Sequence, residues 1–152
     1  MTGPSALHAL QDHFVSMPPV AAMQVSVAGH ENGQLSLHAP LSANVNDKHC
    51  AFGGSLTSLM TLAGWGLVTL QLEAAGLHAD VFVADSEVRY LAPLYADLLA
   101  TASAAEGESW DTFMETLQQR GRARIMVVAR VTLPDGGIAT EFKGRYVAIR
   151  KG

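Results

Sequence analysis

Apolar and polar residues alternate with different periods along this chain, and each period predicts an element. Residues 5–17 carry apolar side chains at helical spacing, which predicts a helix capped by Ser5 and ended by Pro18-Pro19. Residues 20–28 alternate with a period of two, which predicts a strand. Asn32-Gly33 then predicts a hairpin turn into a second strand.

The longest apolar stretch runs from Gly53 to Leu72 and carries no charge until Glu73. A helix that is apolar on nearly all sides is either a buried core helix or a membrane span. This stretch contains several serine and threonine residues and lacks flanking basic clusters and aromatic belts. We therefore predict one long helix buried at the centre of the fold, and no membrane span.

After Gly76 the period of two returns. Residues 81–91 and 97–105 each predict a strand, and Ser109 predicts the N-cap of a short helix that ends at Gly121. The first of these is predicted to be a half-buried strand in an antiparallel sheet. One face of that strand is predicted to hold Phe82, Ala84, Ser86, Val88 and Tyr90.

Two more strands are predicted over residues 122–133 and from Ile138 to Ala148, joined by the turn LPDGG. Both place apolar residues on one face and charged residues on the other. The order helix, two strands, long helix, four strands predicts an α+β fold. We expect an antiparallel sheet of about six strands wrapped around the central helix, in a single domain spanning residues 1–152.

Composition narrows the function classes. The formal net charge is −4 and no basic stripe is present, which argues against nucleic acid as a partner. A single cysteine and the lack of a signal-peptide pattern favour the reducing cytoplasm. Hydrophobic residues form 49% of the chain, so part of the apolar surface is expected to be buried between subunits, in a dimer at least.

The motif that leads into the long helix carries the candidate chemistry. It reads Asn-Asp-Lys-His-Cys-Ala-Phe-Gly-Gly-Ser over residues 46–55, and Leu-Ala-Gly-Trp-Gly follows at residues 62–66. Together with the order of elements, it resembles the hotdog fold, and most closely the YiiD C-terminal-type thioesterase-like domains. Their motif reads close to N-x-N-D-K-G-T-x-F-G-G-S. The usual Gly-Thr of that motif is His49-Cys50 here.

The resemblance implies a homodimer or a dimer of dimers, with sheets joined edge to edge and sites at the subunit boundary. It implies hydrolysis of an acyl thioester carried by coenzyme A or acyl carrier protein. No separate cofactor is expected, since coenzyme A or phosphopantetheine belongs to the substrate. Related enzymes place a carboxylate either at the position of Cys50 or on the helix at the position of Thr61. Neither carboxylate is present in this chain.

Thioester hydrolysis needs donors for the carbonyl oxygen and a group that activates water. Gly53-Gly54 at a helix N-terminus can supply unpaired N–H groups, and we predict Gly54 as the donor. Asn46 and Asp47 are predicted to hold and activate the water, although both residue types are also common in turns. Thr61 is a candidate for orienting the water, and more often such a threonine bonds back to its own helix.

The remaining motif residues are predicted to contact substrate. They are His49, Cys50, Phe52, Gly53, Ser55 and Tyr90. A nucleophilic role for Cys50 is less common than a buried inert thiol, and no metal site is predicted because His38, Asp47 and His49 lack a ligand spacing. The missing carboxylates leave a second hypothesis open, in which the domain binds acyl-CoA or acyl carrier protein without turnover.

Overall fold

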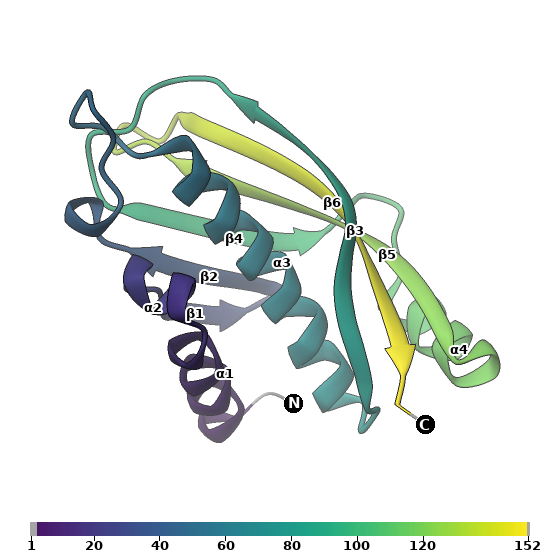
Figure 1. The fold of residues 1–152 in the computed structure, drawn as a ribbon. Coiled ribbons are helices and arrows are strands. Elements are labelled where there is room, and N and C mark those ends of the chain that lie inside the picture. The colour runs from purple at the N-terminus through teal and green to yellow at the C-terminus, as the bar shows by residue number, and fades with distance from the viewer. Residues whose placement is uncertain (1–2, 152) are drawn as a thin grey trace.

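A computed structural model describes residues 3–151. It consists of a curved six-stranded antiparallel sheet in the order β1-β2-β4-β5-β6-β3, with the long helix α3 across its inner face (Figure 1). The predicted α+β class, the antiparallel sheet and the central helix are therefore confirmed. The elements are α1 (Pro4–Ser16), α2 (Pro18–Met23), β1 (Ser26–Glu31), β2 (Gln34–Ala39), η1 (Leu41–Ala43), α3 (Gly53–Ala74), β3 (Ala79–Tyr90), β4 (Leu98–Ala104), α4 (Trp110–Arg120), β5 (Arg122–Thr132) and β6 (Ile138–Arg150).

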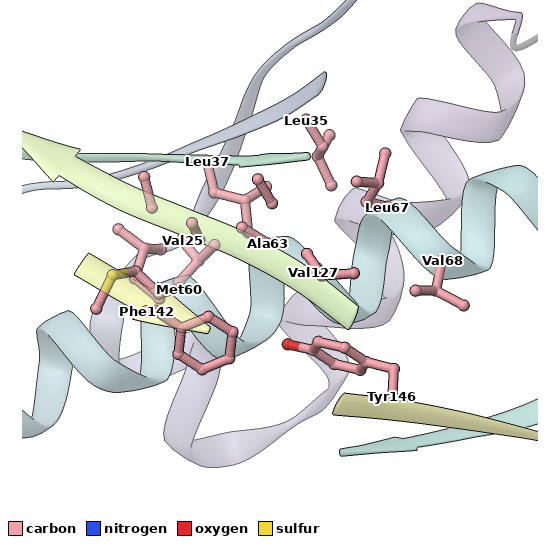
Figure 2. Close-up of a cluster of buried hydrophobic side chains, with 14 of the residues drawn as sticks. Val25, Leu35, Leu37, Met60, Ala63, Leu67, Val68, Val127, Phe142 and Tyr146 are labelled. Carbon is pink, nitrogen blue, oxygen red and sulfur yellow. The ribbon is translucent and has the colours of Figure 1, made fainter. Parts of the chain in front are cut away.

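Helix α3 packs closely on the sheet because two of its four glycines, Gly64 and Gly66, allow a close approach. A methyl group on Gly64 would lie 2.6 Å from Cζ of Tyr146, and one on Gly66 would lie 2.7 Å from the Leu35 side chain. The Tyr146 hydroxyl donates a hydrogen bond to the Thr61 carbonyl (2.6 Å), and Figure 2 shows its oxygen directed toward the core around α3. Burial raises the pKa of Tyr146 well above its ordinary value, so the phenol stays protonated and remains a donor.

Helix α3 is also long and apolar enough to cross a membrane by length and composition. However, 56% of its most apolar window is buried inside the protein, and it contacts strands β2 to β6. The helix therefore packs in the core, as the charge-free apolar run predicts.

The period-two pattern of the last two strands is confirmed. On β5 the inward residues from Ala123 to Val131 are buried, and on β6 the same holds from Thr140 to Ala148. Their charged residues lie on the outer face. The Asn32-Gly33 turn joins β1 to β2 with both residues at positive φ, as a type I′ turn requires.

The strand prediction over residues 20–28 is wrong in its first half. Pro18 and Pro19 do end α1, but they also begin α2, because proline fits the first turn of a helix without losing a hydrogen bond. A short apolar run cannot distinguish strand from helix by period alone. Similarly, α1 begins at Pro4 with Gly3 as its N-cap, so the predicted cap at Ser5 is wrong by two positions.

Strand β3 carries a bulge that reverses the predicted assignment of its first residues. Its register against β6 shifts between Val83 and Asp85, where Ala84 is the extra residue. Val81 and Val83 therefore share the inner face with Val88, whereas Phe82 faces outward. Strand β3 is also an edge of the sheet and is exposed along most of its length.

Candidate active site

The loop before α3 is anchored to the rest of the fold by its first residue. The Asn44 side chain is buried and donates hydrogen bonds to the carbonyls of Met23 and Pro40, at 3.0 and 2.8 Å. Its own carbonyl accepts the N–H of Phe52 (2.7 Å), which closes the loop. The two ends of the loop, Asn44 and Phe52, are therefore held together beside the start of α3.

Asn46 organises the loop interior. Its Oδ1 accepts the N–H groups of Lys48 (2.8 Å) and Cys50 (3.1 Å), and its Nδ2 lies 3.3 Å from the Cys50 Sγ. These bonds occupy much of the amide that we predicted to hold a water. The cysteine is buried behind this amide.

The next turn of the loop places His49 in the left-handed region, with φ of +65°. A residue with a Cβ has a steric cost in this conformation that glycine avoids. This backbone conformation therefore explains why the family motif has a glycine at the position of His49. His49 and Asp47 are both exposed, and Asp47 pairs with Lys48 at 3.0 Å.

Helix α3 begins without a side-chain cap. Phe52 occupies the N-cap position, where Ser, Thr, Asp or Asn is usual, and Leu56 donates the first helical hydrogen bond to its carbonyl (3.0 Å). Within residues 3–151 the structure gives no hydrogen-bond partner to the N–H groups of Gly53, Gly54 and Ser55. These donors stand at the positive end of the helix dipole, which favours a negatively charged oxygen.

A hollow of about 340 Å³ opens beside this helix start, and we call it the mouth. Its lining is mostly apolar and comes from the loop, from α3, from the end of β3 and the chain that follows it, and from β6. The mouth is lined by Ala51, Gly53, Leu56, Tyr90, Leu91, Ala92, Pro93, Leu94 and Thr140.

Tyr90 fixes one wall of the mouth. Its hydroxyl donates to the Gly53 carbonyl (3.2 Å) and lies 2.5 Å from the Thr57 hydroxyl. The ring is nevertheless 57% exposed, so a ligand can reach it. The strand β3 and the helix α3 are thereby joined at the point where the unpaired N–H groups lie.

Among the predicted site residues, the structure brings together Gly53, Gly54, Phe52 and Tyr90. The Phe52 ring lies against Gly54 and is 54% exposed. Ser55 is buried in the first turn of α3. Thr61 lies two turns further on, and its hydroxyl donates to the Thr57 carbonyl (2.8 Å), as a helix threonine commonly does.

The sequence alone did not indicate Thr140. It lies opposite Tyr90 in the β3–β6 ladder, is fully buried, and lines the mouth. Its hydroxyl has no hydrogen-bond partner in the described part of the chain, which is costly for a buried polar group. The available signal was a threonine in the inward row from Ile138 to Ala148, whose other members are apolar or aromatic, but no local pattern placed that row near Gly53.

Residues 3–151 contain no group of three or more His, Cys, Asp or Glu side chains that could hold a metal ion. His38 lies instead 3.1 Å from Asp97. The hydrogen bonds from the Leu41 N–H and from His38 hold the pKa of Asp97 below its usual range. This pair joins the end of β2 to the start of β4, away from the loop that carries Asp47 and His49.

The fold and the uncapped helix start define the class of this protein as a hotdog-type member of the thioesterase superfamily. The family described as "Putative thioesterase (yiiD_Cterm)" matches residues 7–150. The chain therefore belongs to this family, and the resemblance seen in its motif is confirmed.

Solved structures agree with this assignment. A protein from Shewanella oneidensis described as a putative thioesterase is 30% identical, with 97% of this chain and 99% of that chain covered and a TM-score of 0.86. A Chlorobaculum tepidum protein of unknown function is 27% identical, with 95% and 94% covered and a TM-score of 0.88. A Haemophilus influenzae thioesterase shares the fold at 14% identity, with 99% and 93% covered and a TM-score of 0.77.

Proposed function

We propose that this protein hydrolyses acyl thioesters, carried by coenzyme A or acyl carrier protein, at the N-terminus of α3. The observation that carries the proposal is the set of unpaired N–H groups of Gly53, Gly54 and Ser55 beside the mouth. Preorganised donors of this kind stabilise the oxyanion that forms when a nucleophile attacks a carbonyl.

In this proposal the thioester oxygen accepts from the Gly54 N–H, and the acyl chain lies against the apolar wall formed by Leu56, Leu91 and Leu94. Water attacks the carbonyl carbon and loses a proton to a base. The C–S bond then breaks, and the thiolate takes up a proton and leaves. The products are a carboxylic acid and a thiol.

Asp47 remains our proposed base. Its side chain is 79% exposed and pairs with Lys48, so it can act only when that surface ion pair opens, which costs little in water. The Asn46 amide and the Thr61 hydroxyl are proposed to position the water indirectly, since both already make hydrogen bonds within the chain.

A homodimer or a dimer of dimers is also part of the proposal. Strand β3 is a long edge strand and exposes Phe82, at 55%, and Val83, at 42%. Such an edge tends to pair with another chain. Antiparallel pairing of two copies would bring the first half of a partner's β3 toward Tyr90 and the mouth, where the partner could contribute to the site. A monomeric mass in solution at micromolar protein would contradict this part.

The experiment is a panel of short, medium and long acyl-CoAs, with release of free thiol as the readout. We expect release above background for at least one chain length, and a large loss of rate in the Asp47→Asn variant. Lys48→Gln is the matched control, because it opens the same ion pair without removing the carboxylate. No thiol release from any substrate would contradict the proposal, and full activity of Asp47→Asn would remove Asp47 from it.

One observation favours a second function, a non-catalytic acyl-CoA or acyl carrier protein binding module. The residues that line the mouth include no carboxylate. Tight calorimetric binding of a non-hydrolysable acyl-CoA analogue, without turnover of the matching ester, would favour this alternative. In either case we expect a cytoplasmic location, because the single cysteine suits a reducing compartment.

A further inference from the structure

A second hollow, of about 590 Å³, lies on the outer face of the sheet where α4 ends and β5 begins. Figure 1 shows α4 beside this end of β5. Four arginines line the hollow, and we call it the arginine hollow: Arg120, Arg122, Arg124 and Arg145. The chain as a whole is acidic, with 10 basic against 14 acidic residues, so this gathering of positive charge is a local feature.

The backbone explains why these arginines meet. Gly121 ends α4 in the left-handed conformation, so the last helical residue, Arg120, and the first strand residue, Arg122, flank one tight turn. On β5, Arg122 and Arg124 alternate with buried residues and face outward. Arg145 joins them from the adjacent strand, because its partner in the β5–β6 register, Met126, lies two positions beyond Arg124.

The floor of the hollow is formed by small apolar side chains. It includes Val147, which pairs with Arg124 across the ladder, and Ala84, the extra residue of the β3 bulge. Small side chains here leave room between the surrounding guanidinium groups. The volume lies within the range of about 300–1,000 Å³ that is typical of sites for small molecules.

Among the described residues, most of these guanidinium groups have no counterion. Of the four, only Arg145 has an acidic partner there, Asp85 at 3.4 Å. Within residues 3–151 the structure gives Arg120, Arg122 and Arg124 neither an ion pair nor a side-chain hydrogen bond. Four like charges that line one hollow repel one another, and a bound anion would relieve that repulsion.

Neutralisation of the α4 C-terminus does not account for the cluster. The Leu117 carbonyl already accepts the Gly121 N–H (2.8 Å), and the Gln118 carbonyl accepts from Arg150 Nη1 (2.9 Å). Arg150 and the glycine turn thus satisfy two of the last carbonyls, which a C-terminal cation usually meets. The other arginines remain free to face the hollow.

We infer that the arginine hollow binds a phosphate-bearing small molecule. Guanidinium groups form paired, charge-assisted hydrogen bonds with phosphate oxygens, and several of them around one hollow suit a ligand with more than one phosphate. Two sources share this chemistry. One is the nucleotide portion of an acyl-CoA, which rests on the proposed function, and the other is a free nucleotide that binds independently of thioester chemistry.

Calorimetric titration with coenzyme A, adenosine 3′,5′-bisphosphate and ATP, at low salt, tests the site. We expect at least one probe to bind, and the double variant Arg122→Gln/Arg124→Gln to weaken its binding by about tenfold or more. Arg130→Gln is the matched control, because Arg130 lies on the same face of β5 but outside the hollow. Absence of binding by every probe, or unchanged affinity in a double variant that melts like the wild type, would overturn the inference.

Two further measurements separate the sources. If the ligand is the carrier, the double variant raises KM for acyl-CoA but leaves cleavage of an acyl-N-acetylcysteamine, which carries no phosphate, unchanged. If it is a free nucleotide, ATP binds and the KM for acyl-CoA does not move. Phosphate binding without any thioester cleavage would remove the proposed function and keep this site. Thioester cleavage without phosphate binding would keep the proposed function and overturn this site. If the double variant lost only its binding of acyl carrier protein, the assignment to a small molecule would be overturned.

Discussion

Helix α3 contains two pairs of glycines that the fold uses in opposite ways. Gly53 and Gly54 lie at the mouth, where the nearest atoms to an added methyl belong to the exposed rings of Tyr90 and Phe52. Gly64 and Gly66 lie in the core, where the nearest atoms belong to fully buried side chains. One pair keeps a space accessible to solvent, whereas the other lets the sheet and α1 approach the helix. The same residue type therefore serves a site at one end and packing in the middle.

The largest effect that would test this contrast is the loss of stability in Gly64→Ala. The new methyl would lie 2.6 Å from Cζ of Tyr146, and neither group can move away from a packed core. Overpacking and the loss of the Tyr146–Thr61 hydrogen bond should outweigh the gain in helix propensity, for a net cost of about 3 kcal/mol. Thermal unfolding should show a Tm lower by about 10 °C.

Adding Tyr146→Phe to Gly64→Ala is the control for this prediction. The double variant lacks the hydroxyl that the new methyl would contact, so it should recover part of the loss, and the two changes should not be additive. An unchanged Tm in Gly64→Ala would show that the core can relax. It would contradict the proposed difference between the two pairs of glycines.

At the mouth, Gly54→Ala should reduce turnover without a loss of stability. The methyl would lie 2.6 Å from the Phe52 ring, which is exposed and can rotate, and alanine favours the helix by about 1 kcal/mol. Crowding beside the unpaired N–H groups should lower kcat/KM by about tenfold to a hundredfold. Ser58→Ala, on the exposed side of the next turn, is the control and should leave both quantities unchanged. If the Gly54→Ala variant were destabilised but fully active, Gly54 would serve packing and not the site.

Thr140→Val tests whether the buried hydroxyl at the mouth serves the reaction. The change keeps the shape and removes a polar group without a partner, so the free energy of unfolding should stay the same or rise by about 1 kcal/mol. If the hydroxyl contacts substrate or water, kcat/KM should fall by about tenfold. Thr69→Val is a close match, since Thr69 also has an unpartnered buried hydroxyl but lies in the second half of α3. Equal activity in both variants would give Thr140 no part in the site.

The smallest effect is expected for His49→Gly in the loop. His49 has φ of +65°, and glycine adopts this conformation without the steric cost of a Cβ. The greater freedom of glycine in the unfolded chain offsets part of the gain, so stability should rise by about 0.5–1 kcal/mol. Chemical denaturation measures this change in stability. A rise in KM without a change in kcat would indicate that His49 contacts the substrate. A clear loss of stability would contradict the conformational explanation.

The sequence alone determined the features that depend on local pattern. The charge-free run predicted α3, Asn32-Gly33 predicted its hairpin, and Ser109 and Gly121 predicted both ends of α4. The motif before α3 predicted the family and the uncapped helix start. These predictions succeed because period, turn preference and capping act among residues that are close in sequence.

Other features were decided only by the tertiary structure. The bulge at Ala84 reversed the faces of β3, and no local period shows where a ladder gains a residue. Thr140 and Gly53 line the same mouth, although 87 positions separate them in the numbering, because the β3–β6 register places Thr140 opposite Tyr90, whose hydroxyl bonds to the Gly53 carbonyl. The arginine hollow likewise joins the end of α4 to two strands. Sites of this kind form where sheet register brings distant residues together, and register is a property of the whole sheet.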